Sequence, residues 1–582
     1  NQSEFGDPDM GWDRSEWAKW GDPVYNAALI DTSQAGSLRG PGDFYTTIPG
    51  TPTTTYGKRY TSNMGAKLDL TKQFGSAHEV KIGGELNYYT MRRYDVNAFN
   101  YLRRQVTAAS VAGTSAYLTD WDFYKGLGTT FIGYDIHGEK TVNEDEMYAT
   151  NVGGKEVNIN AHNAAPHPTT VGAYIQDRIE LKDLIINAGL RLDYIDNGVP
   201  GFKDLTALTS GTGQTIGDEN FTDNRTYTYV SPRLGFSFPV TDKVVFHAQY
   251  GKYVQAPRFD GQGVGANSVG YMQLTQYLYG GGYAVQLYNP NLKPERQTTF
   301  EFGFKQEFGG IASIDATAFY KDTRDLTTMR VIIPTVSDYR APYFNMNQDF
   351  GTVKGLSFTF NLRRTNRVQI MANYTYSDAK GTGSAPNSHF DIAWQEQTPT
   401  FPRVIGALDF DQRHKGWMDI DFRWAKDDGP ELFGMKPLSR FGINASLNFH
   451  SGTPYTKVSA AYGAEGVFTF NAPEPLEAYN ASTLDWFYQL DLKIDKSFKV
   501  GPLDFNAYIW AINLLDTKSP TNLWRATGRP DDNGWLATEA GRTWAKTYGE
   551  EGVKWYYAAL TDCGTYGWQA PRVVRAGLQF DF

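Results

Sequence analysis

The sequence lacks several features that would decide its fold quickly. It has one cysteine, Cys563, which excludes an internal disulfide framework and a cysteine-rich zinc module. No stretch approaches the ~18 consecutive apolar residues of a transmembrane helix. The opening residues, Asn1–Asp9, have neither the basic start nor the apolar core of a signal peptide, so we expect a mature, cleaved or truncated chain.

Catalytic and metal-binding motifs are also missing. The eight histidines form no H-E-x-x-H pattern, no G-x-S-x-G motif occurs, and the glycine-containing runs lack phosphate-loop spacing. We therefore expect neither enzymatic activity nor a cofactor, and for His162 and His167 we favour incidental loop positions over a site for a metal-bearing ligand. Residues 143–146 and 531–534 are acidic but lack EF-hand spacing, which favours solvated loops, with a surface calcium site as the alternative. The mild net charge of −9 disfavours a nucleic-acid partner.

The sequence is rich instead in aromatic residues and glycine. Its 37 Tyr, 35 Phe, 14 Trp and 59 Gly suit many half-buried strands joined by polar loops. The clearest strand closes the chain, where Val574, Ala576, Leu578, Phe580 and Phe582 alternate with Arg575, Gly577, Gln579 and Asp581. A strand with one apolar and one wet face that ends on an aromatic residue is typical of a transmembrane β-barrel.

The same alternation recurs along the chain, and short turns alternate with long loops. We predict strands over residues 58–72, 80–88, 173–182, 184–196, 233–240, 243–253, 298–308, 311–320, 351–363, 367–378, 401–410, 417–424, 440–450, 484–498, 503–515 and 571–582. We expect long loops near residues 94–167, 197–226, 254–295, 321–350, 379–400 and 516–570. Bacterial outer-membrane barrels have short turns at one end of the strands and long loops at the other, whereas soluble sandwiches and propellers do not. The sequence therefore predicts an all-β, antiparallel transmembrane β-barrel.

The order of the predicted strands contains a gap. Short turns and long loops should alternate along the chain. Counted from its two ends, the connection between strands 440–450 and 484–498 would have to be external and internal at once, so we predict one more strand near Pro454–Phe470. The total is then about 17, and an odd number would leave a parallel closing pair. We therefore expect that an N-terminal part of the barrel is absent from this chain. Residues 1–57 would form an extracellular loop region and residues 58–582 the barrel.

One segment carries a family resemblance. Tyr288–Phe304 contains Asn-Pro-Asn-Leu-Lys-Pro-Glu and resembles the segment that leads from a long extracellular loop into a strand of TonB-dependent outer-membrane receptors. Weaker similarities to that family cover Tyr250–Phe259, Ser451–Tyr455, Asn513–Asp516 and the terminal strand. Over residues 58–582 the chain resembles the barrel portion of the family, and it is most similar to the large-looped, Oar-like members.

The resemblance implies a barrel of about 22 strands in the bacterial outer membrane, with a globular plug in its lumen. It also implies a terminal box that engages the energy-transducing TonB protein. The sequence shows neither plug nor box, so we expect the plug and the first strands on a missing N-terminal part or on another chain. The TonB complex would act through that part. Outer-membrane lipid is an expected partner and a surface lipoprotein a further one, and Phe582 would serve as the membrane-insertion signal.

The function that the resemblance implies is energised uptake of a scarce or bulky nutrient, such as a siderophore, a glycan or a peptide. The alternative is a structural or adhesive outer-membrane barrel with an external cap, as part of a larger surface assembly. A secreted soluble β-protein is a third hypothesis, which predicts partitioning into buffer without detergent. The residues themselves support the barrel, whereas the transport cycle follows only from the resemblance.

Candidate site residues fall into three groups. Charged residues of inward parity are expected to line a wet lumen: Asp193, Glu301, Asp491 and Asp495. Aromatic residues near the strand ends are expected to form an interfacial girdle: Tyr194, Trp486 and Tyr488. Loop tryptophans either pack a folded external cap or present stacking surfaces to a ligand: Trp121, Trp524, Trp535, Trp544, Trp555 and Trp568.

Overall fold

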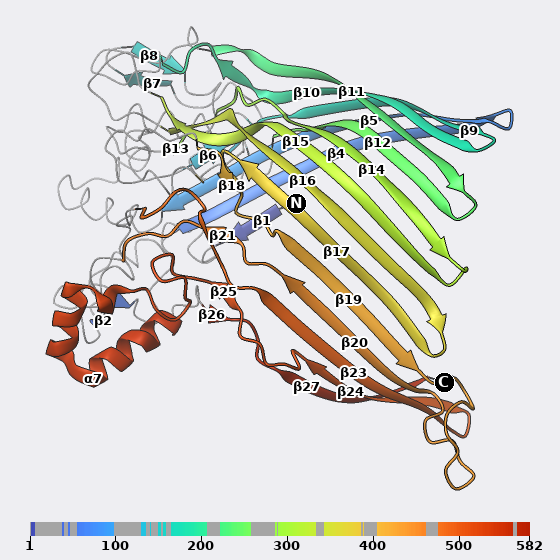
Figure 1. Cartoon of the computed structure of the whole chain (residues 1–582). Coiled ribbons are helices and arrows are strands. Elements are labelled where there is room, and N and C mark those ends of the chain that lie inside the picture. Colours follow the sequence, from blue (N-terminus) through green and yellow to red (C-terminus); the bar gives the residue numbers. More distant parts are fainter. Residues whose placement is uncertain are drawn as a thin grey trace.

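A computed structural model gives the fold of the chain (Figure 1). It describes residues 2–5, 38–39, 45–46, 55–97, 130–134, 140, 149–152, 155–158, 165–206, 221–257, 286–287, 289–332, 343–385, 388, 404–460, 475–562 and 567–581. Within these residues almost all regular structure is β, and one sheet contains 19 strands. Of the helices in the described ranges, none is both long enough and apolar enough to cross a membrane.

Long antiparallel strands form the body of the sheet. They pair in this order: β4 (Thr55–Phe74), β5 (His78–Asn97), β9 (Thr169–Leu181), β10 (Leu184–Phe202), β11 (Phe221–Thr241), β12 (Val244–Gln255), β14 (Glu295–Phe308), β15 (Ala312–Val331), β16 (Tyr343–Thr365), β17 (Val368–Gly381), β19 (His414–Arg423), β20 (Phe441–His450), β23 (Phe487–Val500), β24 (Leu503–Ile512) and β27 (Val573–Asp581). A short strand, β1 (Gln2–Phe5), pairs with β4 along residues 57–60. Consecutive long strands are therefore neighbours in space.

Smaller elements lie mostly where the long connections begin. Three short strands join the main sheet: β6 (Thr130–Ile132), β13 (Gln286–Leu287) and β18 (Gly406–Ala407). Four separate ribbons pair β2 (Leu38–Arg39) with β3 (Tyr45–Thr46), β7 (Ala149–Val152) with β8 (Lys155–Asn158), β21 (Pro454–Tyr455) with β22 (Ser482–Thr483), and β25 (Pro520–Asn522) with β26 (Gly567–Trp568). A 3₁₀ turn, η7 (Trp535–Ala537), precedes the helix α7 (Glu539–Asp562), which is kinked at Gly549.

The two ends of the strands differ, as the sequence predicts. At one end, which we call the short-turn end, most strands reverse within a few residues (Figure 1). Between β14 and β15, Gly309 (φ 57°) and Gly310 (φ 73°) form such a turn, closed by the Ile311 N–H donating to Phe308 O at 3.1 Å. Both positions need a positive φ, which glycine adopts without steric cost. The other end, which we call the loop end, carries the long connections.

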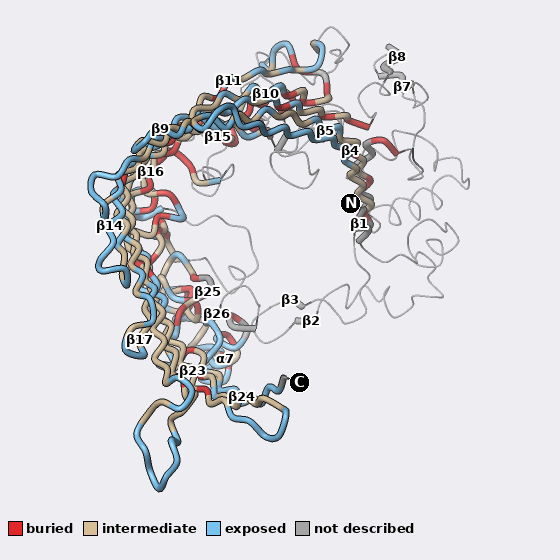
Figure 2. The backbone as a smooth tube through the Cα atoms, turned by 90° about the vertical axis from the view of Figure 1, so that its right-hand side faces the viewer, coloured by how far each residue is buried: buried red, intermediate tan, exposed pale blue. Residues whose placement is uncertain are grey.

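The sheet curves into an open, C-shaped wall (Figure 2). β1 and β4 lie at one edge and β27 at the other. Among the described residues, no register pairs β27 with β4 or with β1. Curvature of this kind brings side chains together on the concave face and spreads them on the convex face.

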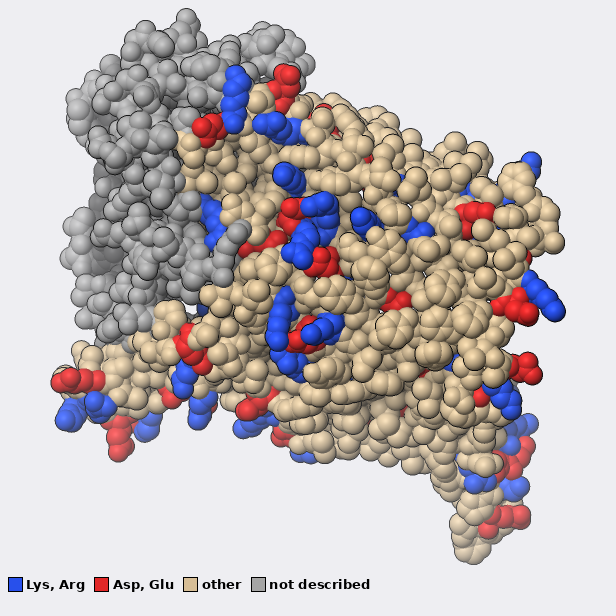
Figure 3. All heavy atoms as spheres, turned by 45° about the horizontal axis from the view of Figure 1, so that its top comes forward, with Lys and Arg blue, Asp and Glu red and all other residues tan. Residues whose placement is uncertain are grey.

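The two faces of the wall follow the predicted period of two. In β10, Leu190, Leu192 and Tyr194 are exposed, whereas Arg191 and Asp193 lie on the opposite face, where they bind each other and Arg191 also reaches Glu85 on β5. Exposed apolar side chains of this parity recur along the convex face. In the view of Figure 3, charged side chains gather towards the loop end and around the short turns, and the band between them carries few charges. A band of that kind suits a hydrocarbon layer.

Two strand predictions are wrong. Within the described residues 404–410 only the two residues of β18 are extended, and β19 pairs directly with β17, for example Ile420 with Ile370. The described part of the predicted strand 401–410 is therefore a loop-end segment in which apolar side chains such as Ile405 are exposed. β20 pairs directly with β23, which leaves no place between them for a strand near Pro454–Phe470. The second error followed from the first. The false strand at 401–410 disturbed the alternation of short turns and long loops, and the strand near Pro454–Phe470 was added to restore it.

Several strands are longer than their alternation predicts. β15 and β16 extend into the expected loop 321–350, and β10 and β11 extend into the expected loop 197–226. In these extensions both faces carry polar residues, so no period-two signal is left to read. The expected loop 516–570 contains a 24-residue helix, and the region 1–57 contributes β1 to the sheet edge.

Candidate functional site

The concave wall carries an ion-pair network near one edge of the sheet. Arg191 on β10 donates through Nη2 to Glu85 Oε1 on β5 at 2.5 Å, and through Nε to Asp193 Oδ1 at 2.7 Å. The first bond reaches across β9, and Gly172 on that strand lies directly beneath the guanidinium. A Cβ at Gly172 would overlap Arg191 Nη2, so the close approach depends on glycine. The network holds three charged side chains flat against the wall.

A similar arrangement lies one strand further towards the edge. The Tyr174 hydroxyl on β9 donates to Asp69 Oδ1 on β4 at 2.5 Å, so its ring crosses β5 above Gly83. A Cβ at Gly83 would lie 2.6 Å from the ring. Lys81 Nζ stands 5.8 Å from the centre of the same ring. The inner surface is thus built from long side chains laid over glycines.

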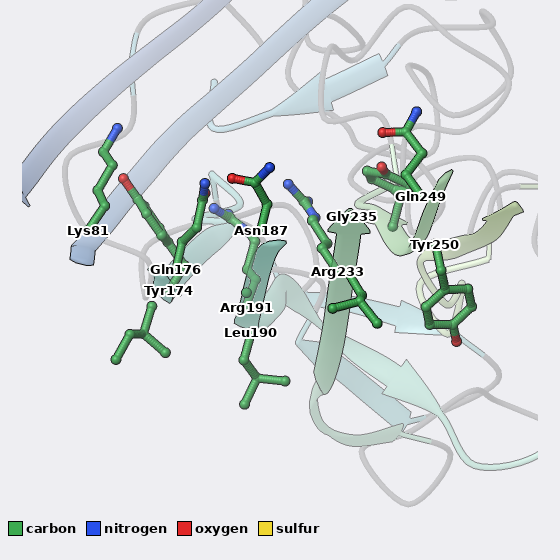
Figure 4. A pocket seen from close by; sticks show the side chains of 14 residues that line it. Lys81, Tyr174, Gln176, Asn187, Leu190, Arg191, Arg233, Gly235, Gln249 and Tyr250 are labelled. Atoms are coloured by element: carbon green, nitrogen blue, oxygen red, sulfur yellow. The ribbon is translucent and has the colours of Figure 1, made fainter. Parts of the chain in front are cut away.

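Residues of β5, β9, β10, β11 and β12 line an open cavity of about 380 Å³ (Figure 4). Three cationic side chains line it, together with three amides: Lys81, Arg191, Arg233, Gln176, Asn187 and Gln249. Gly189 and Gly235 form part of its floor. Arg233 also lies over the Tyr253 ring, at 4.7 Å from its centre. The excess of hydrogen-bond donors suits a carboxylate or another anionic group, either on a solute or on a protein surface that faces the wall.

The opposite half of the wall repeats the pattern with other residues. Arg423 on β19 forms a fork with Asp495 on β23, with both N–O distances at 2.8 Å, and it spans β20 above Gly442. Asp421 accepts from Arg364 at 2.5 Å and joins the same network. On a concave face, the side chains of non-neighbouring strands lie close enough for such bridges, and the glycine between them leaves room.

The segment that carried the family resemblance forms a buried junction at the loop end. The Asn197 amide, fully buried, donates to the backbone oxygens of Pro290 and Leu292, each at 3.0 Å. Asn291 exchanges two hydrogen bonds with the backbone of Phe202, at 2.8 and 3.0 Å. The start of β14 is therefore fastened to the end of β10. We call residues 289–293 and their partners the loop-end junction.

A second strand pair closes the loop-end junction from the other side. Asn347 on β16 donates to Lys293 O at 2.9 Å and accepts from the Lys293 N–H at 2.7 Å. The rings of Phe202 and Phe344, both fully buried, meet at 6.3 Å with their planes near perpendicular. The asparagines of this segment thus replace backbone pairing where the long loop enters the sheet.

A folded unit formed by residues 520–562 stands at the loop end, and we call it the cap. Its core is Trp535, Tyr556 and Leu560, with Trp544 packed against Trp535 at a ring separation of 5.5 Å. The Tyr556 hydroxyl donates to Asn533 Oδ1 at 2.8 Å, and burial raises the pKa of Tyr556 well above its ordinary value. A core of this kind gives the cap a defined shape.

The predicted site residues are placed as follows. Trp524, Trp535, Trp544 and Trp555 pack together in the cap, whereas Trp568 is 44% exposed. Trp121 and Phe582 lie outside the described residues, as do His162 and residues 143–146. The packing agrees with the cap hypothesis, while ligand stacking by these tryptophans stays a prediction.

The charged residues of inward parity all have partners in the wall. Asp193 and Asp495 bind Arg191 and Arg423, Glu301 accepts from Gln249, and Asp491 accepts the Asn513 N–H at 2.9 Å. The three girdle residues, Tyr194, Trp486 and Tyr488, are exposed on the convex side. Sequence parity therefore located these side chains, but it did not show which of them bind one another.

Within the described ranges, no group of three His, Cys, Asp or Glu side chains is arranged to hold a metal ion. His167 stacks on Tyr88 at 5.2 Å and has Thr90 Oγ1 at 3.2 Å from its Nδ1, so it fastens a loop to β5. Asp531 is occupied by two hydrogen bonds of 3.0 Å from Arg529, which lower its pKa. A solvated loop stays the prediction for residues 531–534, with a surface calcium ion as the alternative.

Comparison with known proteins places the chain in a family. Residues 2–514 match the family model described as TonB dependent receptor-like, beta-barrel. A search of curated proteins finds no match. Similar solved structures include FpvA of Pseudomonas aeruginosa bound to a pyoverdine (12% identity, 81% of this chain and 46% of that one, TM-score 0.43). Others are the ferric-catecholate receptor Fiu of Escherichia coli (16%, 81% and 52%, 0.40) and the outer-membrane transporter YddB of Escherichia coli (14%, 80% and 51%, 0.45).

The chain spans about half the length of these solved structures. The family model covers most of this chain and all strands of the main sheet except β27. The sequence resemblance and the apolar convex face agree with that match. The chain belongs to the TonB-dependent receptor β-barrel family of the Gram-negative outer membrane.

Proposed function

We propose that the protein is an outer-membrane receptor that takes up a scarce or bulky nutrient with energy supplied through TonB. The observation that carries the proposal is the polar concave wall beneath a structured loop end, in a chain of this family. A path for a large solute needs a wetted inner surface and a means of capture on the outside. The substrate classes we consider are siderophores, glycans and peptides.

The cationic cavity supports a gated path over a passive one. Lys81, Arg191 and Arg233 offer an anchoring surface for an acidic group on a plug domain or on a solute. Charged side chains that already bind one another, as Arg191 binds Glu85, can exchange partners at small cost in a wet lumen. Such exchange suits a plug that moves when TonB acts on it.

The plug and further strands are part of the proposal. Among the described residues, β4 pairs with β5 along its whole length but on its other side pairs only with β1, at residues 57–60, and β27 pairs on one side only, with β24. An open sheet edge does not persist in hydrocarbon, because each unsatisfied backbone group costs several kcal/mol. We propose that another part of the protein or another chain supplies these strands and the plug, and that TonB acts through that part. A surface lipoprotein over the loop end is a further proposed partner.

The test is uptake by cells that carry or lack the protein. Labelled ferric siderophores, oligosaccharides and peptides are offered separately, with and without a protonophore. We expect one class to enter only in cells with the protein and only when the inner membrane is energised. The double variant Lys81→Gln/Arg233→Gln should slow entry more than Lys243→Gln, which changes an exposed lysine in a short turn.

One observation favours the structural or adhesive alternative. Trp535 and its neighbours are used in the core of the cap, which leaves fewer aromatic faces for a ligand. An adhesive barrel would bind a surface or a glycan without importing it. Binding that a protonophore leaves unchanged, with no labelled compound inside the cells, would support that alternative and contradict the transport proposal.

A further inference from the structure

One connection at the short-turn end differs from the others. β9 and β10 are joined through residues 182–183 and β23 and β24 through residues 501–502, but β19 and β20 are joined through residues 424–440. This longer hairpin is the orange segment at the lower right of Figure 1. The predicted strands 417–424 and 440–450 leave a connection between them, but the sequence did not indicate how that connection folds.

The tip of the hairpin is a two-residue turn with apolar side chains. Leu432 and Met435 exchange backbone hydrogen bonds of 2.8 and 3.0 Å across Phe433 (φ 51°) and Gly434 (φ 74°). A bulky residue rarely adopts a positive φ, and turns of this type favour Asn, Asp or Gly. Phe433 is nevertheless 95% exposed, and Leu432 and Met435 are also exposed. In water this tip would expose apolar surface and keep backbone strain with no compensating contact.

The root of the hairpin fixes its direction. Arg367 donates to both carboxylate oxygens of Asp428, each at 2.8 Å, and the Asp427 N–H donates to Ser439 Oγ at 2.8 Å. Arg367 also lies 5.9 Å from the centre of the Trp424 ring. The tip is therefore held in one orientation.

That orientation is outward. Figures 1 and 2 both show the hairpin leaving the wall on the side away from the concave face, at the level of the short turns. In Figure 3 the end of this projection is uncharged and charges of both signs flank it. A tip that points away from the lumen does not face a plug or a transported solute.

Aromatic side chains connect the root with the convex face. Trp424 meets Phe422 at a ring separation of 4.6 Å and Phe441 at 5.8 Å. Phe422 and Phe441 are on the parity of the apolar face, opposite to Asp421 and Arg423. Tryptophan at the edge of an apolar band is typical of a membrane interface. The hairpin thus continues the lipid-facing surface beyond the end of the strands.

We propose that the hairpin 424–440 is an interfacial anchor that places the Phe433 ring in the lipid leaflet at the short-turn end of the barrel. Its apolar tip enters the boundary between headgroups and acyl chains, while the flanking charges stay among the headgroups. In this family's topology the short turns face the periplasm, so the lipid is the phospholipid of the inner leaflet. The anchor fixes the height of this side of the barrel in the membrane.

The test measures the depth of the tip directly. The full-length protein with Cys563→Ser receives one cysteine at Phe433→Cys, carries an environment-sensitive fluorophore there, and is placed in nanodiscs of phosphatidylethanolamine and phosphatidylglycerol. Lipids with a nitroxide near the headgroup or near the chain end are compared with iodide in the water. We expect quenching by the headgroup-level nitroxide, at a depth of about 5–10 Å, and protection from iodide.

Two controls separate insertion from other causes. A label at Lys426→Cys, on the exposed flank of the hairpin, should respond to iodide and little to nitroxide lipid. To exclude insertion driven by the fluorophore, the label is moved to Glu431→Cys, where nitroxide quenching should fall when Phe433→Ser is added. A label at Ser76→Cys in the β4–β5 turn confirms that the variants keep the same fold.

The opposite result is equally clear. Equal iodide quenching at positions 433 and 426, with no effect of nitroxide lipid at either, would place the tip in water. The proposal would then be overturned, and the exposed tip would be left as a docking surface for a periplasmic protein. If nitroxide lipid does not quench a label at position 431 while Phe433 is present, the proposal is overturned as well.

Discussion

At the loop end, the strands run on into segments that hold one another through buried side-chain hydrogen bonds, whereas at the short-turn end most of them reverse within a few exposed residues. The loop-end junction buries Asn197 and Leu292 completely, and the cap buries Tyr556. At the other end Gly309 and Gly310 meet almost nothing around them. One end of the same strands is therefore packed like a protein core, and the other is held by backbone geometry.

This difference reflects what each end of the strands has to hold in place. A receptor must hold long loops in place without a hydrophobic slab around them, so its loop end needs its own cores. The short-turn end needs only to close hairpins, and any larger feature there, such as the hairpin 424–440, calls for a separate reason. Substitutions at the two ends should consequently differ in size of effect.

The largest effect is expected in the cap. Trp535→Ala should destabilise the cap by about 3–5 kcal/mol, because it removes a buried ring and leaves a cavity. Hydrogen exchange of residues 520–562 measures the change, and the strands should be unaffected. Trp568→Ala, at an exposed position, serves as the control and should change little. Unchanged exchange in Trp535→Ala would show that this ring is not a packing residue.

A smaller effect is expected at the loop-end junction. Asn197→Ala leaves the carbonyl groups of Pro290 and Leu292 buried without their donor, which should cost about 2–3 kcal/mol. The measurement is hydrogen exchange at the start of β14. Asn224→Ala, at an exposed position on the neighbouring strand, is the matched control. If both variants exchange alike, the junction does not depend on the Asn197 amide.

The lumen wall should respond less than either loop-end unit. Gly172→Ala pushes the Arg191 guanidinium away from Glu85, and we expect a loss of about 1 kcal/mol because the wall is partly solvated. Urea unfolding in detergent gives the value. Gly84→Ala is the control, since its Cβ would make an ordinary contact of 3.6 Å. Equal midpoints for the two variants would count against the network.

The smallest effect concerns pH at the short-turn end. Hydrogen bonds from Arg367 lower the pKa of Asp428 to about 2 from 3.8. A carboxyl group whose pKa is lowered in the folded state stabilises it above the ordinary pKa and loses that contribution as the pH falls through the folded value. The hairpin should stay rigid from neutral pH down to about 4 and loosen between 3.8 and about 2.

Fluorescence anisotropy of a label at Glu431→Cys follows this motion. Asp428→Asn should give a hairpin that is already mobile at neutral pH and shows no further change on acidification. A variant that behaves like the parent chain would show that the Arg367–Asp428 pair does not hold the root.

The period-two pattern was enough to predict most of the strands and their faces. Parity predicts that Tyr194 lies on the apolar side and Asp193 in the lumen, and the structure agrees. Where apolar residues lay in a loop, as at Ile405, the same reasoning produced a strand that does not exist. Outside the membrane band both faces of a strand meet water or protein, so parity loses its meaning.

What the sequence by itself determined is the sheet, its two faces, and the sorting of short turns from long loops, because each of these depends on neighbouring residues and on a uniform lipid solvent. Only the tertiary structure decided which charges bind across non-neighbouring strands, how Asn197 and Asn291 fasten the family segment, and that the loop tryptophans form a core. Those contacts join residues far apart in the chain, and their partners are chosen by curvature and packing rather than by local pattern. The outward direction of the hairpin 424–440 is also set by a contact between residues far apart in the chain. Arg367, in the turn between β16 and β17, binds Asp428 at the root of the hairpin.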